Sequence, residues 1–159
     1  MKDINTEGQI KVEGQVRLQV IKDGVVLQDT GFQKNTITNV AFAVFSGLVG
    51  ATGAQTAFTY LAVGTDNTAA SASQTALIAE IVDTGLARAA ATVSRVTTTQ
   101  TNDTLQLAYT WTASGSKTVN EIGVFNAASS GTMAARKLTT ALALVNGAQL
   151  IATYQIKFF

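Results

Sequence analysis

The chain has 159 residues, of which 47% are hydrophobic and 13% are charged, and its formal net charge is +1 at pH 7. This length allows one domain with a substantial hydrophobic core, and the hydrophobic content excludes an intrinsically disordered chain. The chain contains neither cysteine nor histidine, which excludes disulfide bonds, thiolate metal sites and a Ser-His-Asp triad, and we expect no enzymatic activity.

The first 14 residues carry little hydrophobic pattern, because Gly8 and Gly14 interrupt short alternating stretches. An extended arm and an edge strand fit this segment equally well. We predict that it lies across a neighbouring subunit, or adds a strand to it by backbone pairing. The residues expected to make this contact are Lys2, Ile4, Ile10 and Val12. The remaining residues, 15–159, are expected to form a single domain.

A period of two begins at residue 15, where Val16, Leu18 and Val20 alternate with polar residues. This alternation predicts a strand with one buried face. The pair Asp23–Gly24 then separates two apolar runs. A two-residue Asp-Gly loop is typical of a hairpin whose turn residues have positive φ angles.

Residues 40–49 carry apolar side chains at helical spacing, with Thr38 or Asn39 as the candidate N-cap and Gly50 as the candidate stop. We therefore predict one short helix there. Because this helix is apolar on most of its sides, it must pack beneath a sheet or against a neighbouring molecule.

Further along, the composition favours strands, since the chain has 24 threonines, 25 alanines, 13 glycines and no proline. Residues 133–144 fit one strand or two, and residues 75–82 fit a helical turn or an irregular strand. The spacing predicts about seven to nine strands in an all-β sandwich, jelly-roll or immunoglobulin-like. The other expected strands are 58–63, 88–96, 104–112, 119–125 and 150–158.

Several short sequence segments follow one another in a characteristic order. The run NTITN at 35–39 leads into the apolar helix, and FTYLAVGT follows at 58–65. A loop of small residues then ends in Thr75-Ala76-Leu77, and VNEIGVFN and GTMAAR follow at 119–126 and 131–136. This ordered set, within residues 34–158, resembles a class of small β-sandwich virion proteins of tailed bacteriophages. Members of this class are described as head decoration, tail or fibre-associated proteins.

The resemblance implies a structural role in a virion that is assembled in the host cytoplasm, and it implies no catalytic residues. We expect a head decoration protein that docks on the major capsid protein as a symmetric homo-oligomer, with a trimer as the expected form. Binding only to the assembled shell would stabilise that shell by mass action. The alternative within the virion is a tail, collar or fibre-attachment subunit. The low charge agrees with extensive contacts between subunits.

A different function class is a carbohydrate-binding module for host adhesion. Tyr109 and Trp111 share one face of a predicted strand and would stack on sugar rings if they were exposed. We expect them in the core instead, since large aromatic side chains dominate core packing. A glycan hydrolase would need paired carboxylates in a cleft, with Glu80 and Glu121 as candidates, and is the least favoured function.

Glu121 is notable because it lies inside an apolar strand. A buried carboxylate requires a charged or hydrogen-bonding partner. We predict a structural ion pair with one of three arginines: Arg88, Arg95 or Arg136.

Neither nucleic acid nor a membrane is an expected partner. The net charge of +1 is too small for a strong nucleic-acid footprint, and no apolar run reaches about 18 residues. The polar start MKDINTEGQ differs from a signal peptide. Asp66, Asn67 and Asp103 offer loop oxygens without the spacing of a calcium-binding loop, so we expect no metal and no cofactor.

Overall fold

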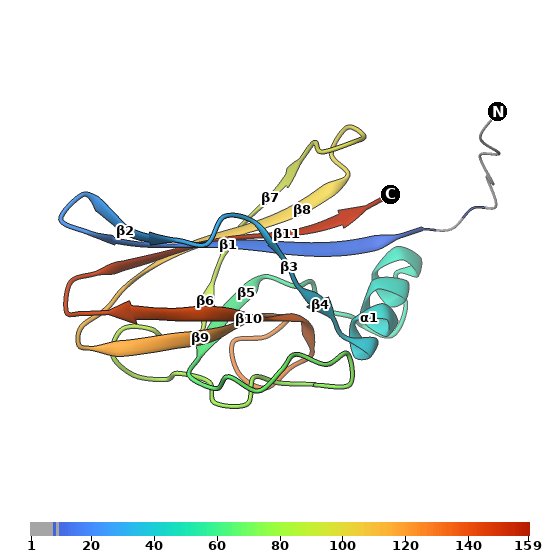
Figure 1. The fold of residues 1–159 in the computed structure, drawn as a ribbon. Coiled ribbons are helices and arrows are strands. Elements are labelled where there is room, and N and C mark those ends of the chain that lie inside the picture. Colours follow the sequence, from blue (N-terminus) through green and yellow to red (C-terminus); the bar gives the residue numbers. More distant parts are fainter. Residues whose placement is uncertain (1–7, 9) are drawn as a thin grey trace.

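The structure, a computed structural model that describes residue 8 and residues 10–159, is an all-β sandwich of two antiparallel sheets. Figure 1 shows the sheets as two stacked layers, with the helix α1 (Asn39–Gly50) at one end. The described residues form eleven strands, against the seven to nine expected, because two short strands at 33–34 and 36–37 were not expected and the expected strand 88–96 is divided in two.

The first sheet has the strand order β2-β1-β11-β8-β7, and β3 also pairs with β1. Its centre is the long pair of β1 and β11, which stay in register from Val12 opposite Phe158 to Ile21 opposite Gln149. The strands of this sheet are β1 (Val12–Lys22), β2 (Val25–Asp29), β3 (Gln33–Lys34), β7 (Thr92–Val96), β8 (Thr104–Thr112) and β11 (Gln149–Phe158).

The second sheet has the order β4-β10-β9-β5-β6. The segment 133–144 is a single strand in it, with two register irregularities against β9. The strands of this sheet are β4 (Thr36–Ile37), β5 (Tyr60–Gly64), β6 (Ala89–Ala90), β9 (Lys117–Phe125) and β10 (Met133–Leu144).

The core lies between the two sheets. Val16, Leu18 and Val20 of β1 are buried and their polar neighbours are half-buried, which confirms the predicted alternation. The turn after β1 also has the predicted geometry, since Asp23 and Gly24 have φ angles of 51° and 77°. The β1–β2 hairpin therefore forms as the Asp-Gly pair indicates.

The helix forms where its spacing predicts, but it ends differently. Ala51, rather than Gly50, takes the left-handed conformation that terminates α1, with a φ angle of 51°. The backbone N–H of Thr52 then donates to the carbonyl of Gly47 at 2.9 Å. At the other end Thr38 precedes the helix in an extended conformation, but its hydroxyl donates to the carbonyl of Met133 instead of capping the helix.

The predicted strand 88–96 is divided between the two sheets. β6 pairs with β5 in the second sheet and β7 pairs with β8 in the first. Ala91 lies between them and donates its backbone N–H to the carbonyl of Thr59 at 2.8 Å. Of the two structures expected for residues 75–82, the irregular strand is the nearer. Glu80 forms an isolated antiparallel bridge with Gly64, and the N–H groups of Thr65 and Ile81 donate to the carbonyls of Ala79 and Val63 at 2.9 Å.

The sheet begins earlier than the expected domain start at residue 15. β1 starts at Val12, and Lys11 and Phe159 exchange two backbone hydrogen bonds at 2.6 and 3.0 Å. Gly14 does not interrupt the strand but lies within β1. The side chain of Asn35 occupies the space that a Cβ atom at residue 14 would need. Residues 11–14 thus pair with the body of the sandwich.

Candidate functional site

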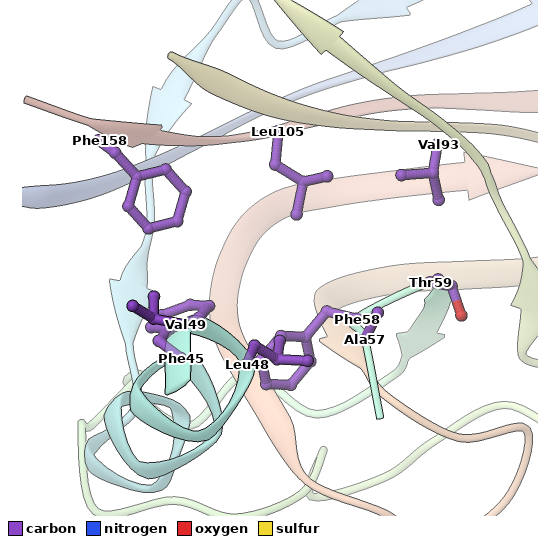
Figure 2. A pocket seen from close by; sticks show the side chains of 9 residues that line it. All are labelled: Phe45, Leu48, Val49, Ala57, Phe58, Thr59, Val93, Leu105 and Phe158. Carbon is purple, nitrogen blue, oxygen red and sulfur yellow. The ribbon is translucent and has the colours of Figure 1, made fainter. Parts of the chain in front are cut away.

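An apolar groove lies between α1 and the inner face of the first sheet (Figure 2). Phe158, Leu105 and Val93 line the side formed by the sheet, while Leu48 and Phe58 lie opposite them. The cavity volume of this hollow is about 280 Å³. The opening exists because α1 lies beside only part of the sheet surface that β7, β8 and β11 present at this end.

Phe45 organises the aromatic side chains of the groove. Its ring packs edge-to-face against those of Phe42, Phe58 and Phe158, with centroids 6.2, 5.5 and 5.7 Å away. Such T-shaped contacts are favoured by the ring quadrupoles. They connect the helix to both layers of the sandwich, so the groove has a packed aromatic wall.

A second hollow of about 340 Å³ continues around the helix. It shares Phe45, Val49 and Phe158 with the first hollow and adds Ile10 and Phe42 to the lining. We call the two hollows together the helix-end groove.

The rim of the helix-end groove is unusually apolar for an exposed surface. Val49 is 90% exposed, Ile10 is 79% exposed and Phe42 is 51% exposed. No residue of α1 is charged. The helix end therefore keeps a cluster of large apolar side chains in contact with water, a pattern that marks contact sites in soluble proteins.

Three charged side chains, Lys11, Glu13 and Lys34, cluster near the start of β1. Lys11 and Lys34, whose side chains are 62% and 82% exposed, lie 2.7 and 3.7 Å from the carboxylate of Glu13. The hydrogen bond from Lys11 is the main cause that holds the pKa of Glu13 below its ordinary value. Consecutive side chains of a strand point to opposite faces of the sheet. Because Val12 lines the groove, Glu13 and its two lysines lie on the outer face of the first sheet.

A buried ion pair fixes the second sheet to the long loop above it. Glu121 on β9 accepts a hydrogen bond from Nε of Arg136 on β10 at 2.7 Å, and both side chains are fully buried. Glu121 also accepts one from the backbone N–H of Ala79 at 2.9 Å. Arg136 Nη1 donates to the carbonyl of Thr68 and to Gln74 Oε1 at 2.9 and 3.0 Å. The pair thereby clamps residues 65–80 onto the sheet.

Of the three arginines considered for Glu121, the structure brings Arg136 to it and places the other two elsewhere. Arg88 donates two hydrogen bonds to the carboxylate of Glu80, at 2.9 and 2.6 Å. The guanidinium of Arg88 also lies over the ring of Phe125, 3.6 Å from its centroid. Arg95 is exposed on β7, in the other sheet. Glu80 and Glu121 are thus each engaged by an arginine, which suits a structural role.

The aromatic pair considered for sugar binding lies in the interior. Trp111 is only 2% exposed, and its Nε1–H donates to the carbonyl of Ala87 at 2.8 Å. Tyr109 is half-buried and packs edge-to-face against Trp111, with centroids 4.9 Å apart. The burial of Trp111 therefore leaves this pair without the aromatic platform that sugar stacking would need.

The loop carboxylates bind backbone groups. Asp103 accepts hydrogen bonds from the backbone N–H groups of Thr98, Thr99 and Gln100 at 2.7 to 2.9 Å, and these bonds hold its pKa well below the ordinary value. Asp66 accepts one from the N–H of Thr68 at 2.6 Å. Across the described ranges no group of three or more acidic side chains is arranged to hold a metal ion.

The residues predicted to contact a neighbouring subunit divide into two pairs. Lys2 and Ile4 lie outside the described residues. Ile10 and Val12 line the second hollow of the helix-end groove. Contact of this segment with another subunit stays a prediction.

The sequence did not reveal the groove itself. The usable signal was the helix at 40–49, whose apolar residues are too widely distributed around its axis for one buried face. In the structure only Ala41, Val44 and Gly47 of α1 are buried. The groove also needs Phe58, Val93 and Phe158, which are distant in the chain and share no motif with the helix.

Within the part of the chain that the structure covers, no helix has both the length and the apolar character needed to cross a membrane. No protein-family model, no curated protein sequence and no solved structure matches this chain.

Proposed function

We propose that this protein is a structural component of a tailed-bacteriophage virion. Its proposed role is a head decoration protein that binds to the major capsid protein as a homo-oligomer. The observation that carries this proposal is the helix-end groove, where Phe42 and Val49 are left exposed on an uncharged helix. A subunit that acts through contacts with other subunits uses such a surface, whereas a monomer in solution is at risk of aggregation.

The phrases that resemble the virion class support the proposal, because they meet in one sheet. Residues 35–39 contain β4 and lead into α1, and 58–65 contain β5. Residues 119–126 and 131–136 contain most of β9 and the start of β10. β4, β10, β9 and β5 are hydrogen-bonded neighbours, in that order. The segments that resemble the virion class therefore lie side by side in one sheet.

The buried clamp suits a docking subunit as well. Glu121 and Arg136 hold residues 65–80 against the second sheet. A loop that is already ordered loses less conformational entropy on binding than a free loop. Repetition of one such contact around an oligomer then raises its avidity for a symmetric shell.

A tail, collar or fibre-attachment subunit is the second candidate. It is favoured by the presence of exposed apolar residues at both ends of the sandwich, since Val25, Val26 and Leu27 of β2 are 60%, 51% and 54% exposed. Such an arrangement suits subunits stacked or joined end to end. The carbohydrate-binding alternative is less favoured, because Trp111 is buried.

Immunogold labelling of purified virions with an antibody against this protein tests the proposal. We expect label spread evenly over the head. Label confined to the tail or neck would replace the decoration role by the second candidate. If no particle is labelled by an antibody that recognises the native protein, the virion proposal is wrong.

A further inference from the structure

The free edge of β7, an outer strand of the first sheet, lacks the protection that the other outer strands have. Native proteins keep outer strands from pairing with other chains by making them very short or by placing bulges in them. Among the described strands, β4 and β6 have two residues each, and the pairing of β2 is shifted at Val20. In contrast, β7 keeps a regular register with β8 along its whole length, Thr92–Val96. It therefore offers an uninterrupted row of backbone groups to a further strand.

Both faces of β7 are open. Residues 92–95 are all exposed, although one face of the strand belongs to the inside of the sandwich. Val93 lines the helix-end groove, and because alternate side chains share a face, Arg95 points to the same inner face. The register places Arg95 opposite Leu105, which also lines the groove. Figure 1 shows β7 at the border of the first sheet, so a strand added there would extend the wall of the groove.

Arg95 limits which strands can pair with this edge. None of the ion pairs between described residues includes Arg95. A charge on the inner face of an outer strand discourages pairing with an apolar strand, and like charges on opposite strands repel each other. A carboxylate on the added strand would instead offset the charge of Arg95. The edge therefore favours an extended segment that carries acidic side chains.

The residues before Ile10 include a segment of this kind. Asp3 and Glu7 are separated by an even number of positions, so both would lie on one face of a strand, together with Asn5. The segment contains no proline, which would remove a backbone donor. Its sequence thus provides the acidic face that the inner side of β7 favours.

The reach of the chain decides which copy provides this segment. Lys11 pairs with Phe159, so the chain leaves the first sheet at Ile10, beside β1 and β11. A strand added beyond β7 would lie four strand spacings from β1, which is roughly 19 Å. The three residues from Glu7 to Ile10 span at most about 11 Å. Residues 3–7 therefore cannot pair with β7 of their own chain.

From these observations we propose that residues 3–7 of a second copy of this chain add a strand to the free edge of β7, with their acidic face toward Arg95. Backbone hydrogen bonds supply the affinity of such a contact, and side chains supply its specificity. Because the segment and the edge are different surfaces, the contact is head-to-tail and builds a ring or an open chain. The inference rests on the homo-oligomer of the proposed function and names the contact that joins its copies.

Cross-linking between two thiol variants tests the contact, because the chain has no cysteine of its own. Thr6→Cys labels the segment and Ser94→Cys labels the middle of β7, and both positions would lie on the outer face of the sheet. Ser129→Cys is the matched control, since Ser129 is exposed on the loop between β9 and β10 of the other sheet. The Thr6→Cys protein is mixed with either acceptor and treated with a short bis-maleimide. Circular dichroism verifies that each variant is folded.

We expect the Ser94→Cys acceptor to be linked to Thr6→Cys at least about 10-fold faster than the Ser129→Cys acceptor. The reason is that a bound segment holds the two thiols at a high effective concentration. A single chain that carries both Thr6→Cys and Ser94→Cys should give a ladder of linked multimers, because its own segment does not reach its own β7.

Charge reversal tests the selection by Arg95. Adding Arg95→Glu to the Ser94→Cys acceptor should remove its advantage over the control acceptor, whereas Arg95→Lys should keep it. The advantage of the Arg95→Glu acceptor should return when the donor carries Asp3→Lys and Glu7→Lys, because the charges are then opposite again.

Other results overturn the proposal. Equal linking of the two acceptors would show that residues 3–7 do not bind beside β7. An internally linked monomer from the double-thiol chain would show that the segment binds its own copy. An Arg95→Glu acceptor with an undiminished advantage would show that the charges do not select the segment. Labelled virions without preferential linking would overturn this contact alone, and preferential linking without labelled virions would overturn the proposed function alone.

Discussion

The Nε atom of Arg136 donates a hydrogen bond to Glu121 at 2.7 Å, in a place where both side chains are fully buried. Around this pair, Thr68, Gln74, Ile78 and Ala79 supply hydrogen bonds. The carboxylate of Asp66 lies 3.7 Å from Nη2 of Arg136. The pair therefore connects two central strands to a loop that contains almost no regular structure. Its integrity should determine whether that loop keeps its position.

Replacement of one partner should be strongly destabilising. Glu121→Gln removes the buried carboxylate that Arg136 binds at 2.7 Å and leaves only Asp66, 3.7 Å from Nη2, as an opposite charge. We expect a loss of about 3–5 kcal/mol in the free energy of unfolding. Replacing both residues by apolar ones, Glu121→Leu with Arg136→Met, should cost less than the single change. Urea denaturation of the three proteins measures these differences.

The exposed pair of Lys117 and Asp83, 2.8 Å apart, offers the control. Asp83→Asn should leave the free energy of unfolding nearly unchanged, because exposed ion pairs contribute little. A Glu121→Gln protein as stable as Asp83→Asn would show that the buried pair is not a clamp.

The helix terminus allows a stabilising change. Ala51 has a φ angle of 51°, a conformation that glycine adopts without the steric cost of a Cβ atom. Ala51→Gly should raise the free energy of unfolding by about 0.5–1 kcal/mol. Differential scanning calorimetry should then show a melting temperature about 1–4 °C higher.

A matched substitution within the same helix should have the opposite effect. Ala43 is exposed in the interior of α1, where glycine is about 1 kcal/mol less favourable than alanine. If Ala51→Gly and Ala43→Gly lower the melting temperature equally, the left-handed terminus assigned to Ala51 is wrong.

Asp103 should make stability depend on pH in the acid range. Backbone N–H groups, first that of Gln100, hold its pKa in the folded protein below the unfolded value near 3.8. A group with a lowered folded pKa stabilises the protein fully above its unfolded pKa, and this contribution is lost as the pH falls through the folded pKa. Stability should therefore fall from about pH 4 downward.

The variant Asp103→Asn isolates this contribution. It should be less stable than the unmodified protein at pH 7, and the difference should shrink as the pH falls from about 4 to about 2. Urea denaturation at each pH measures the difference, and Asp23→Asn is the control, because Asp23 lies 3.6 Å from Lys22 on an exposed turn. A difference that is constant with pH would contradict the role assigned to the Asp103 carboxylate.

The regular elements were predictable because each has a local cause. The alternation of Val16, Leu18 and Val20 marked a strand with one buried face, and Asp23–Gly24 marked its hairpin. The short helix followed from apolar spacing together with candidate residues for its two ends. These patterns depend on neighbours in the chain, so the sequence displays them directly.

The features that could not be predicted depend on contacts between distant segments. The break at Ala91 reflects a hydrogen bond to Thr59 and the change from one sheet to the other. The choice of Arg136 over Arg88 depends on the register of β9 against β10, where Arg136 is opposite Gly123 and diagonal to Glu121. The helix-end groove likewise combines α1 with strands that lie far away in the sequence.

The central claim is that the exposed apolar helix end is a surface for assembly. The most direct measurement is sedimentation velocity of the unmodified full chain from about 1 µM to about 1 mM. We predict species heavier than the 16.5 kDa monomer whose share grows with concentration. A single species of 16.5 kDa across the whole range would contradict the claim.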